Sequence, residues 1–295
     1  MINIFYPASS EWEYDFFKND LFPNEKVIIY NESFNFKQYS NAKNILVISK
    51  PTLIQNGEEE IPLFLKNIIT ILKPKCIFHL SDEAAKTQSY HNFYMENCKI
   101  VCHQYNSNKL KYTKEHYQIP LGYIQGFSNT LKYNENKKYD FSFVGQLKND
   151  RIEMLDMFNK KYSKSFINVG NTNWNSVKNQ KIQPKDLYDI YNNSIFVPIG
   201  RGNNSLDCFR LYECIIAGAI PVIVGDFEEI KETFDNNIPN ILHDTSWNKV
   251  LLKCDEVYKN KDKQKEIILN NFEWWKDRIC FIQKIIYKKI FYNIV

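Results

Sequence analysis

Residues 197–223 read VPIGRGNNSLDCFRLYECIIAGAIPVI, and this stretch decides the fold. The apolar run Ser194–Pro198 leads into it and is typical of a buried strand. A glycine-rich turn follows, and the apolar spacing of Cys208–Ala217 predicts a helix. Gly218 is expected to end that helix, because glycine accepts the left-handed backbone at a helix C-terminus, and Ile220–Val224 predicts the next strand. Strand, turn, helix and strand in this order indicate a parallel α/β sheet.

The turn and the start of the helix are suited to bind an anion. Gly200 and Gly202 let the backbone approach a ligand closely. The free N–H groups and the positive dipole end of the following helix point back at the same loop. Arg210 and Glu213 are three residues apart, so they share one face of the helix. Since arginine can hold two phosphate oxygens and glutamate can accept both hydroxyls of a ribose, the pair predicts a nucleoside diphosphate site.

A simple ion pair between Arg210 and Glu213 on the helix surface is the alternative interpretation, and such pairs are common. The patterns Pro-x-Gly-Arg-Gly, Phe-Arg-Leu-Tyr-Glu and Ala-Gly-Ala-Ile-Pro-Val favour a site, because together they resemble the nucleotide-binding segment of exostosin-like glycosyltransferases. The resemblance implies that Arg210 contacts the diphosphate and Glu213 the ribose of a UDP-linked sugar. Arg201 stands in the loop where the family often has a basic residue, and Gly200 and Ser205 of that loop are expected to contact the donor.

A second segment, Phe141–Gly145, resembles the end of the first strand of the nucleotide domain in the same family. The resemblance implies that Gly145 faces the donor and that Arg151 lies near the phosphates. Without it, the same residues indicate only a strand, a turn and the start of a helix.

The N-terminal half shows the same alternation of strands and helices. A helix is expected at Glu58–Leu72, ended by Pro74. The polar stretch 132–138 separates the halves, so we expect an N-terminal acceptor-binding domain at residues 1–135 and a nucleotide-sugar-binding domain at 136–295. Buried strands are expected at Ile2–Tyr6, Lys26–Tyr30, Asn44–Ile48, Lys75–Leu80, Val101–Tyr105 and Ile119–Tyr123.

The resemblance implies the GT-B fold, which is an α/β architecture of two Rossmann-like domains facing a cleft. The last segment, from Phe272 to about Tyr292, has the spacing of a long amphipathic helix. Its apolar stripe is expected to dock on protein, packing back toward the N-terminal domain.

The segment His79–Glu83 follows a predicted strand and resembles the branch of the family that includes ribitol xylosyltransferase-like proteins. That branch makes xylose the first guess for the sugar. An inverting enzyme needs a general base for the acceptor hydroxyl. Asp82, with Glu83 in reserve, is the candidate because open α/β sheets bind ligands at the carboxyl ends of their strands. A helix cap at Ser81 or Asp82 is the alternative. His79 is expected either in the core or as a residue that supports the reacting groups from behind.

Other classes of protein are disfavoured. The net charge of +4 is too small to indicate a nucleic-acid partner. The chain has no Asp-x-Asp motif and no metal-ligand spacing among its cysteines, so we expect no metal and no cofactor beyond the UDP-sugar donor. Since the sequence has no signal peptide and no apolar run long enough to span a membrane, a soluble, cytoplasmic protein is expected.

Two rival functions remain at this stage. A nicotinamide-dependent dehydrogenase needs Gly-x-Gly-x-x-Gly after the first strand of a domain, and neither half supplies it. A non-catalytic carbohydrate- or nucleotide-binding protein of the same fold would not require an intact pair at Arg210 and Glu213. Transfer of a sugar from a UDP-sugar to a glycan hydroxyl is therefore the leading prediction.

Overall fold

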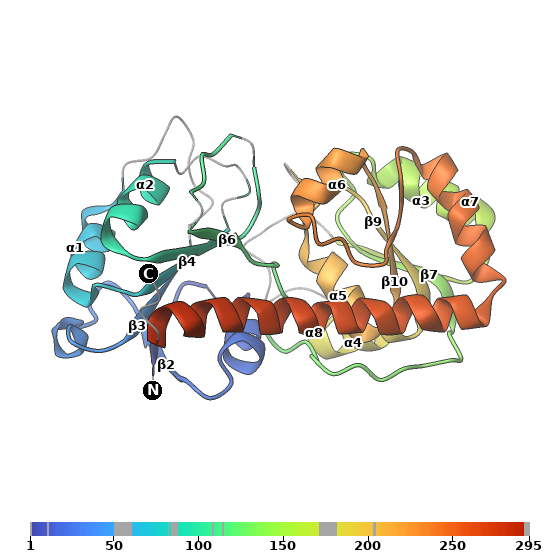
Figure 1. Cartoon of the computed structure of the whole chain (residues 1–295). Coiled ribbons are helices and arrows are strands. Elements are labelled where there is room, and N and C mark those ends of the chain that lie inside the picture. The colour runs from blue at the N-terminus through green and yellow to red at the C-terminus, as the bar shows by residue number, and fades with distance from the viewer. Residues whose placement is uncertain are drawn as a thin grey trace. The chain divides into compact units, whose positions relative to one another are not determined.

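A computed structural model describes residues 2–10, 12–49, 61–81, 83, 88–107, 109–113, 115–170, 182–202 and 205–291. The chain forms two compact units, each with a parallel β-sheet (Figure 1). Unit 1 comprises Met1–Leu121 and Ile279–Val295, and unit 2 comprises Gly122–Arg278. The division thus falls at residue 121 instead of residue 135, and the end of the chain belongs to unit 1.

Unit 1 contains a six-stranded sheet in the order β2-β1-β3-β4-β5-β6. Every neighbouring pair of strands is parallel, as the continuous apolar runs predict. The strands are β1 (Asn3–Pro7), β2 (Lys26–Tyr30), β3 (Asn44–Ser49), β4 (Cys76–Leu80), β5 (Ile100–His103) and β6 (His116–Gln118). The helical segments are η1 (Phe16–Leu21), η2 (Lys37–Tyr39), α1 (Leu63–Leu72) and α2 (Gln88–Asn97).

Helices cover the unit 1 sheet because apolar side chains face it. Ile68 of α1 and Tyr94 of α2 are buried in one core cluster with Leu46 of β3. The ring of Phe78 in β4 instead contacts Phe17 of η1, with ring centroids 5.0 Å apart. A predicted strand at Ile119–Tyr123 was wrong, since the sixth strand lies just before it. The first residues of the helix predicted at Glu58–Leu72 lie outside the described part of the chain.

Unit 2 contains a five-stranded sheet in the order β11-β10-β9-β7-β8, again parallel throughout. The strands are β7 (Tyr139–Gly145), β8 (Ser165–Val169), β9 (Ser194–Ile199), β10 (Ile220–Val224) and β11 (Leu242–Asp244). The helices are α3 (Arg151–Lys161), α4 (Pro184–Asn192), α5 (Phe209–Ala217), α6 (Phe227–Thr233), α7 (Trp247–Tyr258) and the first part of α8 (Lys261–Phe291), whose residues from Ile279 onward belong to unit 1. Phe158 of α3 and Trp247 of α7 share a core cluster with Phe141 of β7.

The helix α5 ends where the sequence predicts. Gly218 takes a left-handed backbone with φ of 77° directly after Ala217. Lys137, which precedes β7, donates two hydrogen bonds of 2.7 Å from its Nζ to the carbonyl oxygens of Asn192 and Gly218. These carbonyls belong to the last turns of α4 and α5, so one side chain caps two helix C-termini.

The long helix α8 starts earlier than predicted, at Lys261. Its last part packs within unit 1, where Gln283 donates to the carbonyl oxygens of Asp20 and Leu21 and Tyr287 donates to Glu25. The expected packing of this helix on N-terminal residues is therefore confirmed. No helix in the described ranges is long and apolar enough to cross a membrane.

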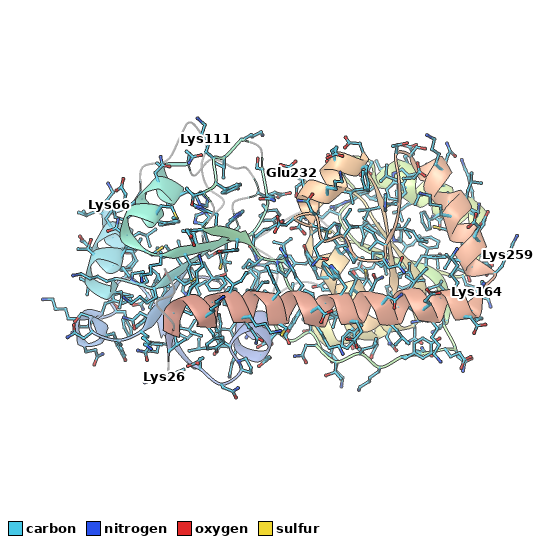
Figure 2. All side chains as sticks on the ribbon, in the orientation of Figure 1. Lys26, Lys66, Lys111, Lys164, Glu232 and Lys259 are labelled. Atoms are coloured by element: carbon cyan, nitrogen blue, oxygen red, sulfur yellow. The ribbon has the colours of Figure 1, made fainter. Side chains whose placement is uncertain are left out.

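The lysines are spread over many elements. Figure 2 labels Lys26 on β2 and Lys66 on α1 in unit 1, and Lys164 before β8 and Lys259 after α7 in unit 2. All four side chains are exposed. This distribution agrees with solvated surface charges instead of one concentrated basic patch.

Candidate nucleotide-sugar site

The candidate site in unit 2 is built where β7 ends and α5 begins. Gly145 is the last residue of β7, and Arg210 is the second residue of α5. A Cβ atom on Gly145 would lie 2.7 Å from Nη1 of Arg210, so the guanidinium rests directly against this glycine. Arg210 donates to the carbonyl oxygen of Val144 at 3.4 Å, and its Cζ lies 5.6 Å from the centre of the Phe143 ring. The fold thus brings together two predicted site residues that are 65 positions apart in the sequence (210 − 145).

Arg210 retains capacity for a ligand. Its Nε atom is buried and has no hydrogen-bond partner within the described residues. The N-cap residue of α5, Cys208, makes no capping hydrogen bond with its side chain, so the first N–H groups of this helix are not satisfied in that way. A guanidinium beside an open helix N-terminus is suited to hold a diphosphate.

Glu213 lies one turn further along α5 and is only 2% exposed. Its Oε1 accepts a hydrogen bond of 3.3 Å from the backbone N–H of Ile124. Burial raises the pKa of Glu213 to about 7, although that hydrogen bond and the charge of Arg210 act in the opposite direction. Since Arg210 and Glu213 are each held by a different backbone group, the surface ion pair that the sequence left open does not describe them.

Arg151 serves as a link between two loops. It is 3% exposed, and it donates to the carbonyl oxygens of Gln146 at 3.0 Å and Arg201 at 2.7 Å. Gly200 makes room for it, because a Cβ atom at that position would lie 2.3 Å from Cγ of Arg151. In this structure, therefore, Gly200 accommodates a side chain, and the guanidinium of Arg151 holds the loop that follows β9.

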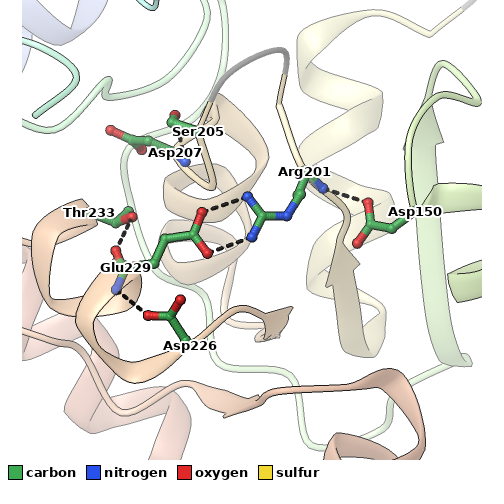
Figure 3. A network of polar contacts seen from close by, with 7 residues as sticks. All are labelled: Asp150, Arg201, Ser205, Asp207, Asp226, Glu229 and Thr233. Carbon is green, nitrogen blue, oxygen red and sulfur yellow. Dashed lines mark hydrogen bonds and ion pairs between the residues drawn. The ribbon is translucent and has the colours of Figure 1, made fainter. Parts of the chain in front are cut away.

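Arg201 is also engaged by protein (Figure 3). Its guanidinium makes two parallel hydrogen bonds of 2.5 Å to the carboxylate of Glu229 on α6, and its backbone N–H donates to Asp150 at 2.9 Å. The side chains of the ion pair are 40% and 26% exposed, respectively. Asp226 accepts a hydrogen bond from the backbone N–H of Glu229 and so caps α6. The basic residue that the resemblance places in this loop is thus held by an acidic partner.

Ser205 shapes the same loop. Its hydroxyl accepts a hydrogen bond of 3.1 Å from the backbone N–H of Asp207, and its carbonyl accepts one of 2.8 Å from Gly202. Figure 3 shows Ser205 and Asp207 beside the Arg201 network. The expected contacts of Gly200, Arg201, Ser205 and Arg151 with the donor stay predictions.

In unit 1, the expected catalytic segment follows β4 directly. Ser81 takes a left-handed backbone with φ of 66°, which is uncommon for a residue with a side chain. Asp82 lies outside the described residues, and Glu83 is half-buried. Their role as general base stays a prediction.

Sequence reasoning missed a buried carboxylic acid at the same edge of the unit 1 sheet. Glu13 follows β1 and is 1% exposed. Ser10 donates to its Oε2 at 3.2 Å, and Gln104, which follows β5, donates to its Oε1 at 3.5 Å. Burial raises the pKa of Glu13 to about 7. The only signal in the sequence is an acid placed between two aromatic residues, Trp12 and Tyr14, shortly after the first strand.

Sequence reasoning also missed a cluster of histidines, although it placed His79 correctly in the core. His91 lies between its neighbours, with ring centroids 5.2 Å from His79, 5.8 Å from His103 and 5.2 Å from His116. The ring of Tyr112 stacks on His103 at 4.2 Å. Burial lowers the pKa of His103 to about 3 and also lowers the pKa values of His91 and His116. His91, His103 and His116 are therefore neutral at physiological pH.

The described residues contain no group of three or more His, Cys, Asp or Glu side chains arranged to hold a metal ion.

No family model matches the chain. An uncharacterised protein of Acanthamoeba polyphaga mimivirus is 23% identical to it over 250 residues, which is 84% of this chain and 83% of the relative. That similarity assigns no activity.

Solved structures are similar over the whole length. The phage T4 β-glucosyltransferase in complex with UDP and Mn²⁺ has a TM-score of 0.51 at 13% identity, covering 99% of this chain and 100% of its own. An α-glucosyltransferase in complex with UDP has a TM-score of 0.53 at 10% identity, with coverages of 95% and 99%. An α1,3-fucosyltransferase has a TM-score of 0.51 at 11% identity, with coverages of 98% and 90%. The chain therefore has the GT-B fold of these glycosyltransferases, as its sequence predicts.

Proposed function

We propose that this protein is an inverting glycosyltransferase that moves a sugar from a UDP-sugar to a hydroxyl group of a glycan. The observation that carries the proposal is the arrangement of α5, where Arg210 lies against Gly145 at the N-terminus of the helix and Glu213 lies one turn further along. Arg210 and the helix N-terminus would hold the diphosphate. Glu213 would accept the hydrogen bonds of the ribose hydroxyls.

This arrangement suits the departure of a nucleoside diphosphate. As the bond between the sugar and the diphosphate breaks, negative charge grows on the phosphate oxygens. A guanidinium that is already fixed against Gly145 and over the Phe143 ring can stabilise that charge without rearranging. Arg210 is therefore the residue on which turnover should depend most in unit 2.

The similar structures support the donor class. Two of them are complexes with UDP, and another similar structure is that of a DNA-modifying β-glucosyltransferase. For this chain, we propose a UDP-sugar donor with xylose as the first candidate, and galactose and glucuronate next. A glycan hydroxyl is the proposed acceptor, with DNA as the competitor to be tested beside it.

The test is a UDP-release assay over a panel of UDP-sugars, with wild type beside Arg210→Ala. We expect turnover of one donor, even as slow hydrolysis, and a loss of about 10²-fold or more in the variant. Lys160→Ala is the matched control, because Lys160 is an exposed cation of the same unit. If no UDP-sugar turns over and no nucleotide raises the melting temperature, a non-catalytic binding protein becomes the better reading.

Metal independence is part of the proposal. The charge of the leaving diphosphate would be balanced by Arg210 and the α5 N-terminus, with Arg201 and Arg151 expected close by. Activity should therefore survive EDTA. Loss of turnover in EDTA that is restored by Mn²⁺ would refute this part of the proposal while leaving the donor class intact.

A further inference from the structure

The carboxyl ends of three unit 1 strands are joined by one polar cluster. Gln104, after β5, accepts a hydrogen bond of 3.0 Å from the backbone N–H of Ser81, after β4. The same amide group donates to Glu13, after β1, and to the carbonyl oxygen of Leu121. Parallel α/β sheets bind their ligands at this edge. The cluster thus occupies the part of unit 1 where a small molecule is expected.

Glu13 is buried in a way that is unfavourable for a charged carboxylate. Its carboxyl group is almost fully buried, and both side chains that donate to it, Ser10 and Gln104, are uncharged. Burying a carboxylate with no cation beside it is unfavourable, so burial favours the protonated form of this group. A carboxyl group whose pKa is raised to about 7 suits general acid–base catalysis, because it can both take and release a proton near neutral pH.

The backbone around this cluster is strained. Ser81 and Tyr105 both have a left-handed backbone, with φ of 66° and 56°, and neither is a glycine. Residues held in this conformation are strained, and they gather at functional sites. Both lie just beyond a strand end: Ser81 donates the hydrogen bond to Gln104, and Tyr105 directly follows Gln104. The strain therefore coincides with the buried acid.

Two aromatic side chains flank the acid. Trp12 and Tyr14 stand on either side of Glu13 in the sequence, and each is half-buried, so each keeps part of its surface exposed. Aromatic faces present an apolar body beside polar groups, which suits a sugar ring with its C–H face and its hydroxyls. Two partly exposed aromatic residues next to the acid in the chain therefore favour a carbohydrate ligand.

We propose that this edge of unit 1 is the acceptor site, that it takes a sugar, and that Glu13 is the general base of the transfer. The inference rests on the proposed function. In the free protein the Ser10 hydroxyl donates a hydrogen bond to Oε2 of Glu13. An acceptor hydroxyl would replace it, with the sugar ring against Trp12 or Tyr14.

The transfer step balances as follows. The acceptor O–H bond breaks, its proton goes to the Glu13 carboxylate, and the acceptor oxygen forms a bond to the anomeric carbon of the donor sugar. The bond from that carbon to the diphosphate oxygen breaks, and the electron pair leaves with UDP. The carboxylic acid of Glu13 then returns its proton to water.

The test compares Glu13→Gln with wild type in transfer from the active UDP-sugar to a sugar acceptor, and measures the Kd for UDP in parallel. We expect kcat to fall by about 10²–10⁴-fold, because that is the usual contribution of a general base, while the Kd for UDP stays within about threefold. Glu96→Gln is the matched control, since Glu96 is an exposed acid of the same unit. It should retain wild-type kcat.

The outcomes separate the two proposals. If wild type neither binds UDP nor turns over any UDP-sugar, the proposed function fails. If wild type is active and Glu13→Gln keeps kcat within about threefold, or if Asp82→Asn alone abolishes transfer, Glu13 is not the base.

The pH dependence of the wild-type protein tests the same assignment without a substitution, so it remains informative even if the variant does not fold. With both substrates saturating, the kcat of wild type should rise with pH through an apparent pKa near that of Glu13, about 7. A kcat that is flat between pH 5.5 and 8.5, a range of roughly 1.5 units on either side, would overturn the assignment.

Discussion

The substitution Gly200→Ala tests whether Arg151 is a structural link. A Cβ atom at position 200 would lie 2.3 Å from Cγ of Arg151 and 3.1 Å from Oδ1 of Asp150. The first distance is far below any normal contact, and it falls on the stem of a side chain that is 3% exposed. Arg151 therefore has to move, and its hydrogen bonds to the carbonyl oxygens of Gln146 and Arg201 have to lengthen or break.

The size of the effect follows from these contacts. Overpacking a buried site costs about 1–3 kcal/mol, and losing a hydrogen bond to a charged group costs about 1.5–3 kcal/mol. We expect the free energy of unfolding to fall by about 3 kcal/mol. For a unit of this size that corresponds to a melting temperature lower by about 6–12 °C.

Thermal unfolding followed by circular dichroism measures the shift. Gly170→Ala is the matched control, because a Cβ atom at that glycine would have nothing within 4 Å. In the background Arg151→Ala, the clashing Cγ atom is gone, so Gly200→Ala should cost less than in wild type. A Gly200→Ala protein that melts within about 1 °C of wild type would refute the assignment of Arg151 as a fixed link.

Three further predictions concern titration and charge. The pKa of Glu213 is about 7, and its ionised form is the better acceptor for ribose hydroxyls. The affinity for UDP should therefore fall about tenfold from pH 8 to pH 6. Calorimetry should find no such loss in Glu213→Gln. The buried His91 and His103 have pKa values below those of histidines in the unfolded chain, so protons favour the unfolded state below about pH 6.5. At pH 5 the free energy of unfolding should therefore be lower by about 2 kcal/mol for each histidine. Urea titrations of His91→Phe should show a smaller loss of stability between neutral pH and pH 5 than wild type shows. For the partly exposed pair of Arg201 and Glu229, a double-mutant cycle should give a coupling energy of about 1 kcal/mol or less that shrinks in high salt, and an unchanged coupling would contradict a solvent-screened ion pair.

Much of the fold was predictable because its strands are continuous apolar runs. The run at Ile220–Val224 is buried on both faces of its sheet, so its composition alone distinguishes it from a half-exposed strand. The end of α5 was predictable because Gly218 carries a local conformational signal. The strand expected at Ile119–Tyr123 was wrong because its apolar residues are buried although the strand itself, β6, ends at Gln118.

The candidate site was predictable only in part. The spacing of Arg210 and Glu213 is local and visible in the sequence, and it placed both residues on one helix. The partners of the other arginines are not local. Arg201 meets Glu229 across 28 positions, and no spacing rule connects a loop to the helix after the next strand.

The same reason explains why Glu13 was missed. Its environment depends on Gln104, which lies 91 positions away. The raised pKa of Glu13 is a property of burial, which an isolated acid in a turn does not reveal. Long-range contacts, not residue types, decide which carboxylic acids can exchange protons near neutral pH.

The double cap made by Lys137 has a consequence for how the nucleotide site tolerates changes in acidity. Burial lowers the pKa of this amine to about 7, so it exchanges between its charged and neutral forms under ordinary conditions. A neutral amine still carries two N–H donors, which is the number of carbonyl oxygens that Lys137 contacts, those of Asn192 and Gly218. The anchor at the C-terminus of α5 therefore depends on hydrogen atoms and not on charge. The helix that presents Arg210 at its other end can thus stay in place on both sides of neutrality.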